Sequence, residues 1–572
     1  MDNLPRVGLL GGGQLGRMLI EESNRLNIPI SVLDADQAPA KQIHAHPKAL
    51  HVNGSFAESE AVRKLASNCD ILTVEIEHVD TTILEEAANA GVRVEPSWKT
   101  IRTIQDKYVQ KQYLESHFIK TAAASQVDFI ADLEAAGVEL GYPMMLKARK
   151  QAYDGKGNYV VESRDDVHNA FEALGKVKGG MYAEKWADFK TELAVMVLKT
   201  KDGVFAYPTV ELISQDSVCK LVYAPVRGVS TKVKEAAQKL AKEAVAPFEG
   251  KGVFGVELFL LQDDSLLVNE IAPRPHNTGH YTIEACPNSQ FAGHLRAILD
   301  LPIPPDSLKQ TRPAIMLNIL GGKHPDSHQP LLLKALAIPN ATIHMYGKGA
   351  SKPGRKIGHV TVTASTMREA ESAMAPLLAE FDTLRAERFN LPPPTTAPPA
   401  PSRHPVVSVT AGSISDQTVL ANVYTVLEKL GIAYEKKITS AHRTPEYMAT
   451  YAKEASARGV RVIIAAAGGA AHLPGMVAAF NKSIPVIGLP VKPSKSDGMD
   501  SLVSMTNMPR GVPVLTVGID NGVNAALGAG RIVGCWDEGV RERVERYAEE
   551  AAEESLENDR RMEGENEKRN AL

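Results

Sequence analysis

Short apolar runs alternate with longer amphipathic stretches along most of this chain, and three apolar runs near its C-terminal end carry the clearest signal. They are rich in β-branched residues and predict buried parallel strands at residues 406–409, 433–438 and 460–466. The polar or glycine-rich loops that follow them lie at residues 412–416, 440–445 and 467–475. Because the carboxyl ends of parallel strands share one sheet edge, we expect these loops to meet in a doubly wound, flavodoxin-like domain.

The N-terminal part shows a similar alternation. Apolar runs at residues 7–10, 30–33 and 71–74 predict parallel strands with helices between them, as in a Rossmann-like α/β domain. The next two hundred or so residues are richer in lysine, glutamate and glycine loops, and a smaller α/β lobe follows them. The predicted domains are therefore residues 1–105, 106–305, 306–388 and 405–540.

Two segments lie outside these domains. Residues 389–404 are dense in proline, which cannot continue a helix or donate to a sheet, so they predict a semi-rigid polyproline II spacer. A recognition tract for a peptide-binding domain is the alternative for this segment. Residues 541–572 are dominated by glutamate and arginine and predict a solvated helix that frays into disorder.

Composition narrows the possible partners and compartments. The chain has 64 Lys and Arg against 68 Asp and Glu, a net charge of -4, which argues against a nucleic-acid-binding scaffold. Its 4 cysteines lie far apart, so neither a disulfide framework nor a zinc site is indicated. No signal peptide and no apolar run of about 18 residues is present. We therefore expect a soluble, cytoplasmic protein with no nucleic-acid or membrane partner.

A glycine loop near the N-terminus allows two interpretations. Residues 11–16 satisfy the pattern G-x-G-x-x-G between a strand and a helix, and Asp34 ends the next strand. This is the dinucleotide fingerprint, in which backbone amides approach a pyrophosphate at a helix N-terminus. The same geometry also holds the single phosphate of a sugar phosphate. The loop alone therefore predicts an anion site and leaves a nicotinamide oxidoreductase open.

Two lysines and two glutamates further along the chain favour a triphosphate ligand over a dinucleotide. Lys107 and Lys147, together with the glycine loop at residues 153–158, suit contact with a triphosphate. Two predicted strands carry Glu257 and Glu270 near their ends. Mg²⁺ takes one or two protein carboxylates and completes its shell with phosphate oxygens and water, so this pair could hold it. Alone, Glu257 would more often be a member of a structural ion pair.

Three motifs carry a family resemblance over roughly residues 5–385. They read Gly-Gly-Gly-Gln-Leu-Gly-Arg-Met at 11–18, Glu-Ile-Ala-Pro-Arg-Pro-His-Asn-Thr-Gly-His at 270–280 and Pro-Gly-Arg-Lys-Ile-Gly-His at 353–359. In this order they resemble the ATP-grasp ligases and, among them, N5-carboxyaminoimidazole ribonucleotide synthetase. The resemblance implies an ATP- and Mg²⁺-dependent carboxylation with bicarbonate as co-substrate, and no need for biotin or NAD.

The same resemblance implies roles for individual residues. ATP would be bound through its phosphates by Lys107 and Lys147, and through adenine and ribose by Glu184, Lys185 and Glu192, while Glu257 and Glu270 would hold Mg²⁺. Aminoimidazole ribonucleotide would be bound by Gly13, Gln14, Leu15, Tyr153, Asp154, Lys156, Lys348 and Arg355. The catalytic residues, where bicarbonate is phosphorylated, would be Arg274, His276 and Asn277. His78 stands where bacterial relatives usually have asparagine, so it receives no role.

The first two C-terminal loops offer hydroxyls, a carboxylate and a guanidinium suited to a ribose 5-phosphate. Those groups belong to Ser413, Asp416, Ser440 and Arg443. His442 is the titratable group of its loop whose pKa naturally lies near neutrality, which general acid/base chemistry requires. A lone loop histidine is usually structural or merely exposed, but the neighbouring groups favour function here.

Residues 405–540 resemble N5-carboxyaminoimidazole ribonucleotide mutase. The resemblance rests on residues 412–416, 440–445, 468–475 and 508–514, which stand in the family's order. It implies that His442 shuttles a proton between N5 and C4, while Gly468, Gly469, Ala470 and His472 enclose the imidazole and carbon dioxide. Pro493 departs from the family pattern and puts the conformation of residues 492–496 in doubt.

Together the two halves resemble the fungal type of phosphoribosylaminoimidazole carboxylase. The first half would carboxylate the N5 amine of aminoimidazole ribonucleotide through carboxyphosphate, and the second would move the carboxylate to C4. The alternative is a C-terminal carboxylase that takes free carbon dioxide, with a nucleotide-binding N-terminal half that does not turn over. The family resemblance also implies a homo-oligomer, an octamer built through the C-terminal domain.

Overall fold

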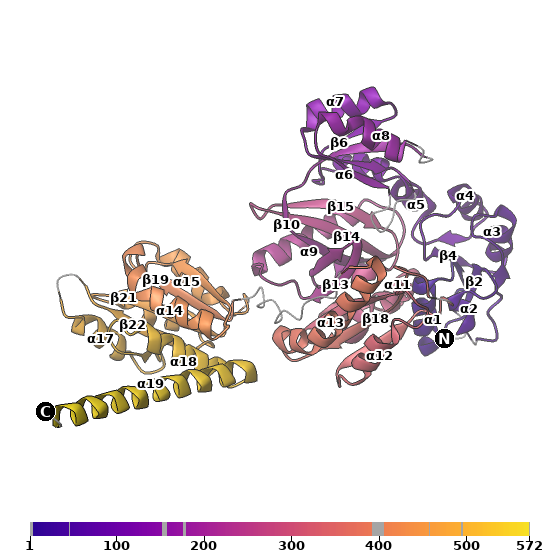
Figure 1. The fold of residues 1–572 in the computed structure, drawn as a ribbon. Coiled ribbons are helices and arrows are strands. Elements are labelled where there is room, and N and C mark those ends of the chain that lie inside the picture. The colour runs from indigo at the N-terminus through magenta and orange to yellow at the C-terminus, as the bar shows by residue number, and fades with distance from the viewer. Residues whose placement is uncertain are drawn as a thin grey trace. The chain divides into compact units, whose positions relative to one another are not determined.

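The computed structural model describes residues 4–44, 46–150, 157–175, 179–349, 351–391, 405–456, 458–493 and 496–570 (Figure 1). Its backbone contacts divide the chain into two compact units. One unit comprises residues 1–226 and 232–397, and the other comprises residues 227–231 and 398–572. The proline-rich spacer predicted at 389–404 lies almost entirely outside the described residues.

The first unit begins with a 5-stranded parallel sheet in the order β3-β2-β1-β4-β5. All four residues of β1 and of β4 are buried, as their uninterrupted apolar sequences predict. Helices α1 (Gln14–Leu26) and α11 (Gln290–Ile298) pack on one face of this sheet, and α3 (Ser59–Ala66) and α4 (Thr81–Asn89) pack on the other. The strands are β1 (Val7–Leu10), β2 (Ile30–Asp34), β3 (Val52–Asn53), β4 (Ile71–Val74) and β5 (Arg93–Val94), which confirms the three predicted strands. The helices are α1 (Gln14–Leu26), α2 (Pro39–Gln42), α3 (Ser59–Ala66), α4 (Thr81–Asn89), α5 (Trp98–Gln105) and α6 (Lys107–Ser116).

A 4-stranded antiparallel sheet follows, in the order β6-β9-β7-β8. Leu133 and Ala136 of α7 and Ala170 of α8 pack on it and close a small separate core. The strands are β6 (Ala124–Val127), β7 (Met144–Ala148), β8 (Asn158–Val161) and β9 (Met181–Lys185), and the helices are η1 (Arg164–Asp166), α7 (Ile130–Leu140) and α8 (Val167–Leu174).

The largest sheet has 9 strands, and it joins two regions that the sequence predicts as separate domains. Its order is β15-β14-β10-β12-β13-β16-β18-β17, with β11 paired to β10, and every pairing is antiparallel. Strand β13 pairs directly with β16, so the predicted small lobe continues this sheet. The strands are β10 (Phe189–Thr200), β11 (Gly203–Ala206), β12 (Val210–Gln215), β13 (Val218–Ala224), β14 (Gly252–Leu261), β15 (Leu266–Ala272), β16 (Ala314–Leu320), β17 (Ala341–Met345) and β18 (Lys356–Thr363). The helices are α9 (Thr231–Val245), η2 (Asn277–Gly279), α10 (Thr282–Ala285), α11 (Gln290–Ile298), η3 (Pro305–Leu308), α12 (Gln329–Leu336) and α13 (Met367–Phe389).

The second unit is a 5-stranded parallel sheet in the order β20-β19-β21-β22-β23, which is the predicted doubly wound topology. The prediction of a buried strand at 433–438 is wrong, because β20 is an edge strand whose side chains are half-buried or exposed. The strands are β19 (Val407–Ala411), β20 (Tyr434–Ile438), β21 (Val462–Gly468), β22 (Val486–Val491) and β23 (Leu515–Thr516). The helices are η4 (Ile414–Asp416), α14 (Gln417–Lys429), α15 (Pro445–Glu454), α16 (His472–Phe480), α17 (Met499–Thr506) and α18 (Gly522–Gly534).

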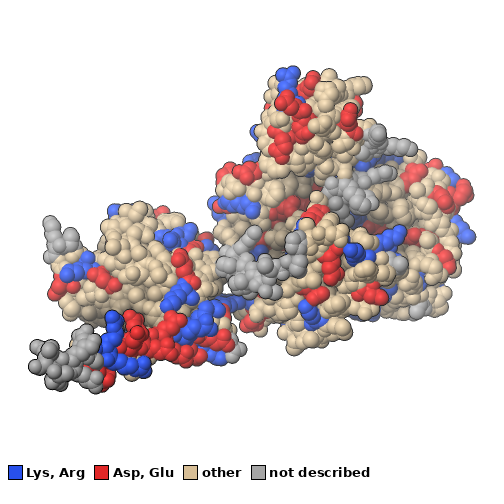
Figure 2. Space-filling model, viewed as in Figure 1, with Lys and Arg blue, Asp and Glu red and all other residues tan. Residues whose placement is uncertain are grey.

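The charged C-terminal segment is one helix, α19 (Glu538–Asn570). Val540 and Val544 near its start pack against the core of the second unit, which anchors it. Figure 2 shows basic and acidic side chains interleaved along its length. The predicted fraying is thus wrong as far as Asn570. Among the described residues, no helix combines the length and apolar character that crossing a bilayer requires.

Candidate functional site

The glycine loop between β1 and α1 is already filled by carboxylates of the same chain. Glu75, at the end of β4, accepts hydrogen bonds from the backbone N–H groups of Gly13 and Gly16. Asp34 accepts a third, from the N–H of Gly12 at 2.7 Å. Burial raises the pKa of Glu75, although the two amides oppose that shift. In this structure the hydrogens of these amides are donated to Glu75 and Asp34, and their contact with a ligand phosphate stays a prediction.

A second cluster gathers three of the residues assigned to the ribonucleotide. The Nζ of Lys348 donates to Oε1 of Gln14 over 2.5 Å, and Nη1 of Arg355 donates to the carbonyl of Lys348 over 3.2 Å. Leu15 packs into the hydrophobic core, so only its backbone could contact a ligand. Tyr153, Asp154 and Lys156 lie outside the described residues. The structure thus brings together Gln14, Lys348 and Arg355, and their role stays a prediction.

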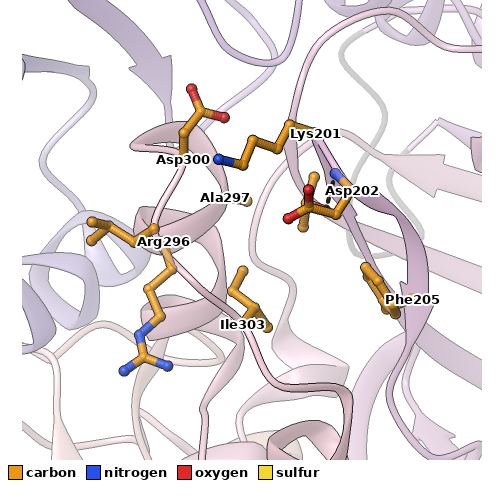
Figure 3. A pocket seen from close by; sticks show the side chains of 9 residues that line it. Lys201, Asp202, Phe205, Arg296, Ala297, Asp300 and Ile303 are labelled. Atoms are coloured by element: carbon orange, nitrogen blue, oxygen red, sulfur yellow. Dashed lines mark hydrogen bonds between the residues drawn. The ribbon is translucent and has the colours of Figure 1, made fainter.

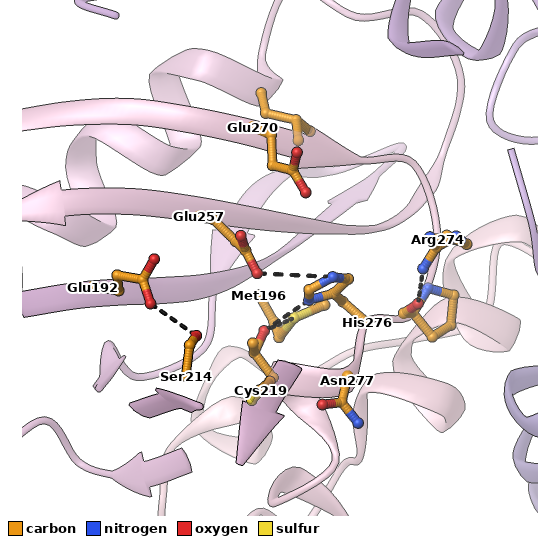
Figure 4. A network of polar contacts seen from close by, with 12 residues as sticks. Glu192, Met196, Ser214, Cys219, Glu257, Glu270, Arg274, His276 and Asn277 are labelled. Atoms are coloured by element: carbon orange, nitrogen blue, oxygen red, sulfur yellow. Dashed lines mark hydrogen bonds and ion pairs between the residues drawn. The ribbon is translucent and has the colours of Figure 1, made fainter. Parts of the chain in front are cut away.

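The two carboxylates assigned to Mg²⁺ face each other across neighbouring strands. Glu257 on β14 is the register partner of Glu270 on β15 (Figure 4). Burial, with the charge of Glu270 beside it, raises the pKa of Glu257 to about 8. Lys107, the first residue of α6, forms an ion pair with Glu270 that lowers the pKa of that carboxyl against the effect of burial. A divalent cation prefers oxygen ligands, and its positive charge would offset the repulsion between these two carboxylates.

Glu192 completes the acidic side of this site. It lies on β10, and Oγ of Ser214 donates to its Oε2 over 2.9 Å. Burial raises the pKa of Glu192, and the charge of Glu270 adds to that shift. Lys185 is exposed at the end of β9. Among the described residues, no group of three or more His, Cys, Asp or Glu side chains could hold a metal ion, so the site would rest on two carboxylates and ligand oxygens.

Glu184 has a different environment from the one its predicted adenine or ribose contact requires. Its side chain is 3% exposed and lies between two lysines: Lys147 on β7, with 2.9 Å from Nζ to Oε2, and Lys111 on α6, with 3.5 Å from Nζ to Oε1. Burial would raise its pKa, but the two lysines prevail and lower it. In this structure the carboxylate therefore positions Lys147. Lys111 was missed in the sequence, where nothing separates it from other helix lysines.

The proposed reaction centre is organised around an ion pair. Arg274 binds Glu77 through two hydrogen bonds, of which Nη2 to Oε1 spans 3.0 Å. Burial opposes the charge of Glu77, but Arg274 holds its pKa at about 2. His276 lies beside Arg274, and burial together with that positive charge lowers its pKa to about 4. Its Nε2 is 3.9 Å from Oε1 of Glu257, so a neutral imidazole adjoins the carboxylate pair.

Asn277 is fixed by a residue that sequence reasoning also missed. The side-chain amides of Asn277 and Asn318 exchange two hydrogen bonds of 2.9 and 2.7 Å, and both residues are buried. Asn318 lies on β16 and also donates to the carbonyl of Cys219 over 2.8 Å. These two bonds use one N–H and one lone pair of the Asn277 amide, which leaves one of each for contact with a substrate.

In the second unit, the three predicted loops do meet at one edge of the sheet. Nη2 of Arg443, in the loop after β20, donates to the carbonyl of Gly412 after β19 over 2.9 Å. The N–H of Arg443 donates to Oγ of Ser440 over 3.1 Å, which shapes the loop. Oγ of Ser413 caps η4, and burial raises the pKa of Asp416 in the same turn.

The third loop joins this edge through a pair of histidines. Nε2 of His442 lies 2.8 Å from Nδ1 of His472, the first residue of α16. The N–H of Gly469 donates to Oγ of Ser501 over 2.9 Å, and the positive φ of 66° at this residue suits glycine. Gly468, Ala470, His442 and His472 are all exposed at this edge.

One hollow of the first unit lies apart from these residues. It is lined by Lys201, Asp202, Phe205, Arg296 and Asp300, among others (Figure 3). Its volume is about 20 Å³, little more than one water molecule needs, so it cannot hold a ribonucleotide.

Four family descriptions match successive parts of the chain. The ribonucleotide synthetase preATP-grasp domain matches residues 4–105, and the ATP-grasp domain matches residues 112–291. The phosphoribosylaminoimidazole carboxylase C-terminal domain matches residues 314–373, and AIR carboxylase matches residues 406–554.

Relatives are similar over nearly the whole length. Phosphoribosylaminoimidazole carboxylase of Ogataea methanolica is 48% identical, over 93% of this chain and 97% of its own. The enzyme of that name from Schizosaccharomyces pombe is 47% identical over 96% of each chain. Among solved structures, carboxyaminoimidazole ribonucleotide synthase of Aspergillus clavatus complexed with ATP is 59% identical, with a TM-score of 0.65, covering 67% of this chain and 100% of that one. The N5-carboxyaminoimidazole synthase of the same organism with ADP and 5-aminoimidazole ribonucleotide is 58% identical, with a TM-score of 0.64 and the same coverage.

Proposed function

The chain belongs to the phosphoribosylaminoimidazole carboxylase family, and from that premise we propose how its residues divide one conversion between two sites. The enzyme converts 5-aminoimidazole ribonucleotide to its 4-carboxy derivative, with an N5-carboxyaminoimidazole ribonucleotide synthase half and an AIR carboxylase half fused in one chain. We also propose domain limits at residues 1–105, 106–305, 306–388 and 405–540, of which the second and third share one sheet through the pairing of β13 with β16.

In the synthase half, ATP would phosphorylate bicarbonate to carboxyphosphate beside Arg274 and His276. Lys107 and Lys147 would balance the charge of the phosphates, and Arg274, oriented by Glu77, would hold the bicarbonate. The N5 amine would then attack the carboxyl carbon and release phosphate. The low pKa of His276 means that its imidazole is neutral, so it can hydrogen-bond to the amine without adding positive charge beside Arg274.

Glu257 and Glu270 fit Mg²⁺ because they present two facing carboxylates, one of which has a raised pKa for want of positive charge. When bound, the ion would supply charge compensation for the phosphates of ATP. Lys107, which pairs with Glu270, would then be free to turn toward the nucleotide.

The cluster of Gln14, Lys348 and Arg355 would bind the phosphate of the ribonucleotide. The amides that a pyrophosphate would need donate to Glu75 and Asp34, which favours the ribonucleotide over the dinucleotide alternative. The first half is therefore assigned to a ribonucleotide and ATP.

In the second unit, Ser413, Asp416, Ser440 and Arg443 would hold the ribonucleotide while His442 moves a proton. The N5–carboxylate bond breaks and releases carbon dioxide as N5 takes a proton from His442. C4 then attacks the carbon dioxide, and His442 recovers a proton from C4. Gly468, Gly469, Ala470 and His472 would enclose the gas and exclude water.

The observation that carries this proposal is the presence in one chain of the carboxylate pair Glu257 and Glu270 and the imidazole pair His442 and His472. The test supplies the full chain with ATP, aminoimidazole ribonucleotide and ¹³C-bicarbonate. We expect one ADP for each C4-carboxylated product, with label in the carboxylate. Product formed at low bicarbonate without ATP consumption would instead support the alternative of a direct carbon dioxide carboxylase.

Assembly and compartment follow from the same family relationship. We propose a homo-octamer formed through the C-terminal domain, to be checked by light scattering on the full chain. All four cysteines lie in the described part of the chain and none of them forms a disulfide, which suits a reducing compartment such as the cytosol.

A further inference from the structure

Two histidines end the motifs at residues 270–280 and 353–359, and the reaction described above uses neither. His280 follows the short helix η2, and His359 lies on β18. Both are fully buried, and their rings stack with centroids 4.7 Å apart at an interplanar angle of 27°. Two segments distant in the sequence therefore meet through this pair of imidazoles.

On one side, the stack is tied to the proposed reaction centre through Gln290. Its Nε2 donates to Nδ1 of His280 over 3.1 Å and to the carbonyl of His276 over 2.8 Å. Its Oε1 accepts the N–H of His276 at 2.9 Å. The backbone of His276 and the ring of His280 thus share a single buried anchor.

On the other side, the stack is tied to the proposed phosphate cluster. The hydroxyl of Tyr346 lies 2.9 Å from Nδ1 of His359. Lys348 follows two residues later, and its Nζ lies 5.4 Å from the centroid of the Tyr346 ring. His344 also stacks on His359, at 4.6 Å, and is itself held by Glu284 at 2.6 Å from its Nε2. The position of Lys348 therefore depends on His359 through Tyr346.

The stacked histidines reduce the stability of the fold in a way that apolar rings would not. Nε2 of His280 and Nε2 of His359 are buried and have no hydrogen-bond partner within the described part of the chain. Burial lowers the pKa of both imidazoles well below the ordinary value, so both are neutral. A buried polar atom without a partner destabilises a fold, which points to a role other than stability.

We propose that His280 and His359 are positioning residues that fix the spacing between the reaction centre at Arg274, His276 and Asn277 and the phosphate cluster at Lys348. This rests on the proposed function, in which one ribonucleotide binds Lys348 through its phosphate while its amine reaches the reaction centre. A ligand held at both ends needs its two sites at a fixed distance, and small misplacements reduce the rate strongly.

The test is His359→Leu in the full chain, followed through ADP formation that depends on the ribonucleotide and bicarbonate. We expect the KM for aminoimidazole ribonucleotide to rise about tenfold and kcat to fall, while the KM for ATP stays within about twofold. A merely structural role would reduce the active fraction or change both KM values alike, and either result would overturn the proposal.

A matched pair of variants separates stacking from hydrogen bonding. Tyr346→Phe removes the hydroxyl, and the double variant Tyr346→Phe with His359→Phe keeps a ring in the stack with no unpaired hydroxyl. We expect the double variant to return the ribonucleotide KM to within about threefold of the parent. If it folds with an unchanged melting temperature and the KM stays about tenfold raised, the stack does not set the spacing. This pair also decides the question if His359→Leu does not fold.

Lys348→Met is the reference variant, because it tests the phosphate assignment separately from the positioning role of the two histidines. If it raises the ribonucleotide KM and His359→Leu does not, the positioning role is wrong and the phosphate assignment stands. If Lys348→Met leaves that KM unchanged, the phosphate assignment itself is wrong, and the positioning role falls with it.

Discussion

Nε2 of His442 lies 2.8 Å from Nδ1 of His472, so the proposed proton carrier and a residue of the glycine-rich loop share one hydrogen bond. His442→Asn should reduce carboxylate transfer to C4 by a factor of about 100 or more, the usual contribution of a positioned acid/base group. Ribonucleotide binding should change little, because Ser440 and Arg443 remain. The measurement is C4-carboxylated product formed per ADP, in which ADP formation is the internal control.

His472→Asn is the matched variant, because asparagine can still hydrogen-bond to Nε2 of His442. A much smaller loss is expected for it. Transfer at the parental rate in His442→Asn would show that another group carries the proton.

Mg²⁺ binding should release a proton, because the pKa of Glu257 is raised to about 8 from an ordinary value of 4.5. Below pH 8 the metal must displace this proton, so its apparent affinity should rise by up to about tenfold per pH unit between about pH 5 and 8. The folded metal-free state holds the proton more tightly than the unfolded chain, so its stability should fall as pH rises through the same range.

Calorimetry of magnesium–ATP binding, repeated in buffers of different ionisation enthalpy, measures how many protons are released on binding. Glu257→Gln has no proton to release and should bind more weakly, with little dependence on pH. Equal proton release by the parent and Glu257→Gln would contradict the assignment.

Acid should weaken the first unit through the pair of Glu77 and Arg274. The folded-state pKa of Glu77 is about 2, below its ordinary value of 4.5, so the pair stabilises the fold above pH 4.5 and its contribution is lost as pH falls toward 2. Glu77→Gln should cost about 3–5 kcal/mol at neutral pH, because Arg274 would remain buried without a counter-charge.

Urea unfolding of the first unit, followed by its tryptophan and tyrosine signals, measures this effect. The double variant Glu77→Gln with Arg274→Met is the control, and it should recover much of the stability while remaining inactive. A single variant as stable as the parent would mean that solvent already screens Arg274.

Lys111→Met should weaken ATP binding although Lys111 is too deeply buried to touch the nucleotide. With Lys111 removed, Glu184 would interact with Lys147 alone and hold it more tightly. We expect the KM for ATP to rise about threefold to tenfold, with the ribonucleotide KM unchanged. The double variant Glu184→Gln with Lys111→Met has no carboxylate at this position to hold Lys147, so its KM for ATP should fall below that of Lys111→Met. A KM for ATP that stays as high as in Lys111→Met would disprove this coupling.

Much of this architecture follows from local sequence, because strands and the loops after them are encoded by neighbouring residues. The edge joining Gly412, Arg443 and His472 was predictable in this way. The hydrogen bond from Gly13 of the glycine loop to Glu75 was not predictable, because the two residues are 62 positions apart in the sequence. The prediction for β20 was wrong because Glu435, Lys436 and Lys437 interrupt the apolar run, and charged side chains are typical of an edge strand.

The burial of charged side chains was the second feature that could not be predicted from the sequence. In the sequence Lys111 looks like any other helix lysine and Glu184 like a nucleotide contact, and their pairing exists only because the fold brings α6 beside β9. The charged composition of α19 predicted a solvated helix but did not reveal its contact with the fold, which Val540 and Val544 make at its start.

The continuity of the sheet from β15 to β17 has a mechanical consequence. Interstrand hydrogen bonds run without a break from the edge strand that bears Glu270 to β17, three residues before Lys348, and they resist shear between the two edges. Entry of ATP and departure of ADP would then depend on hinge motion of the 4-stranded sheet, which carries Lys147 and has a core of its own.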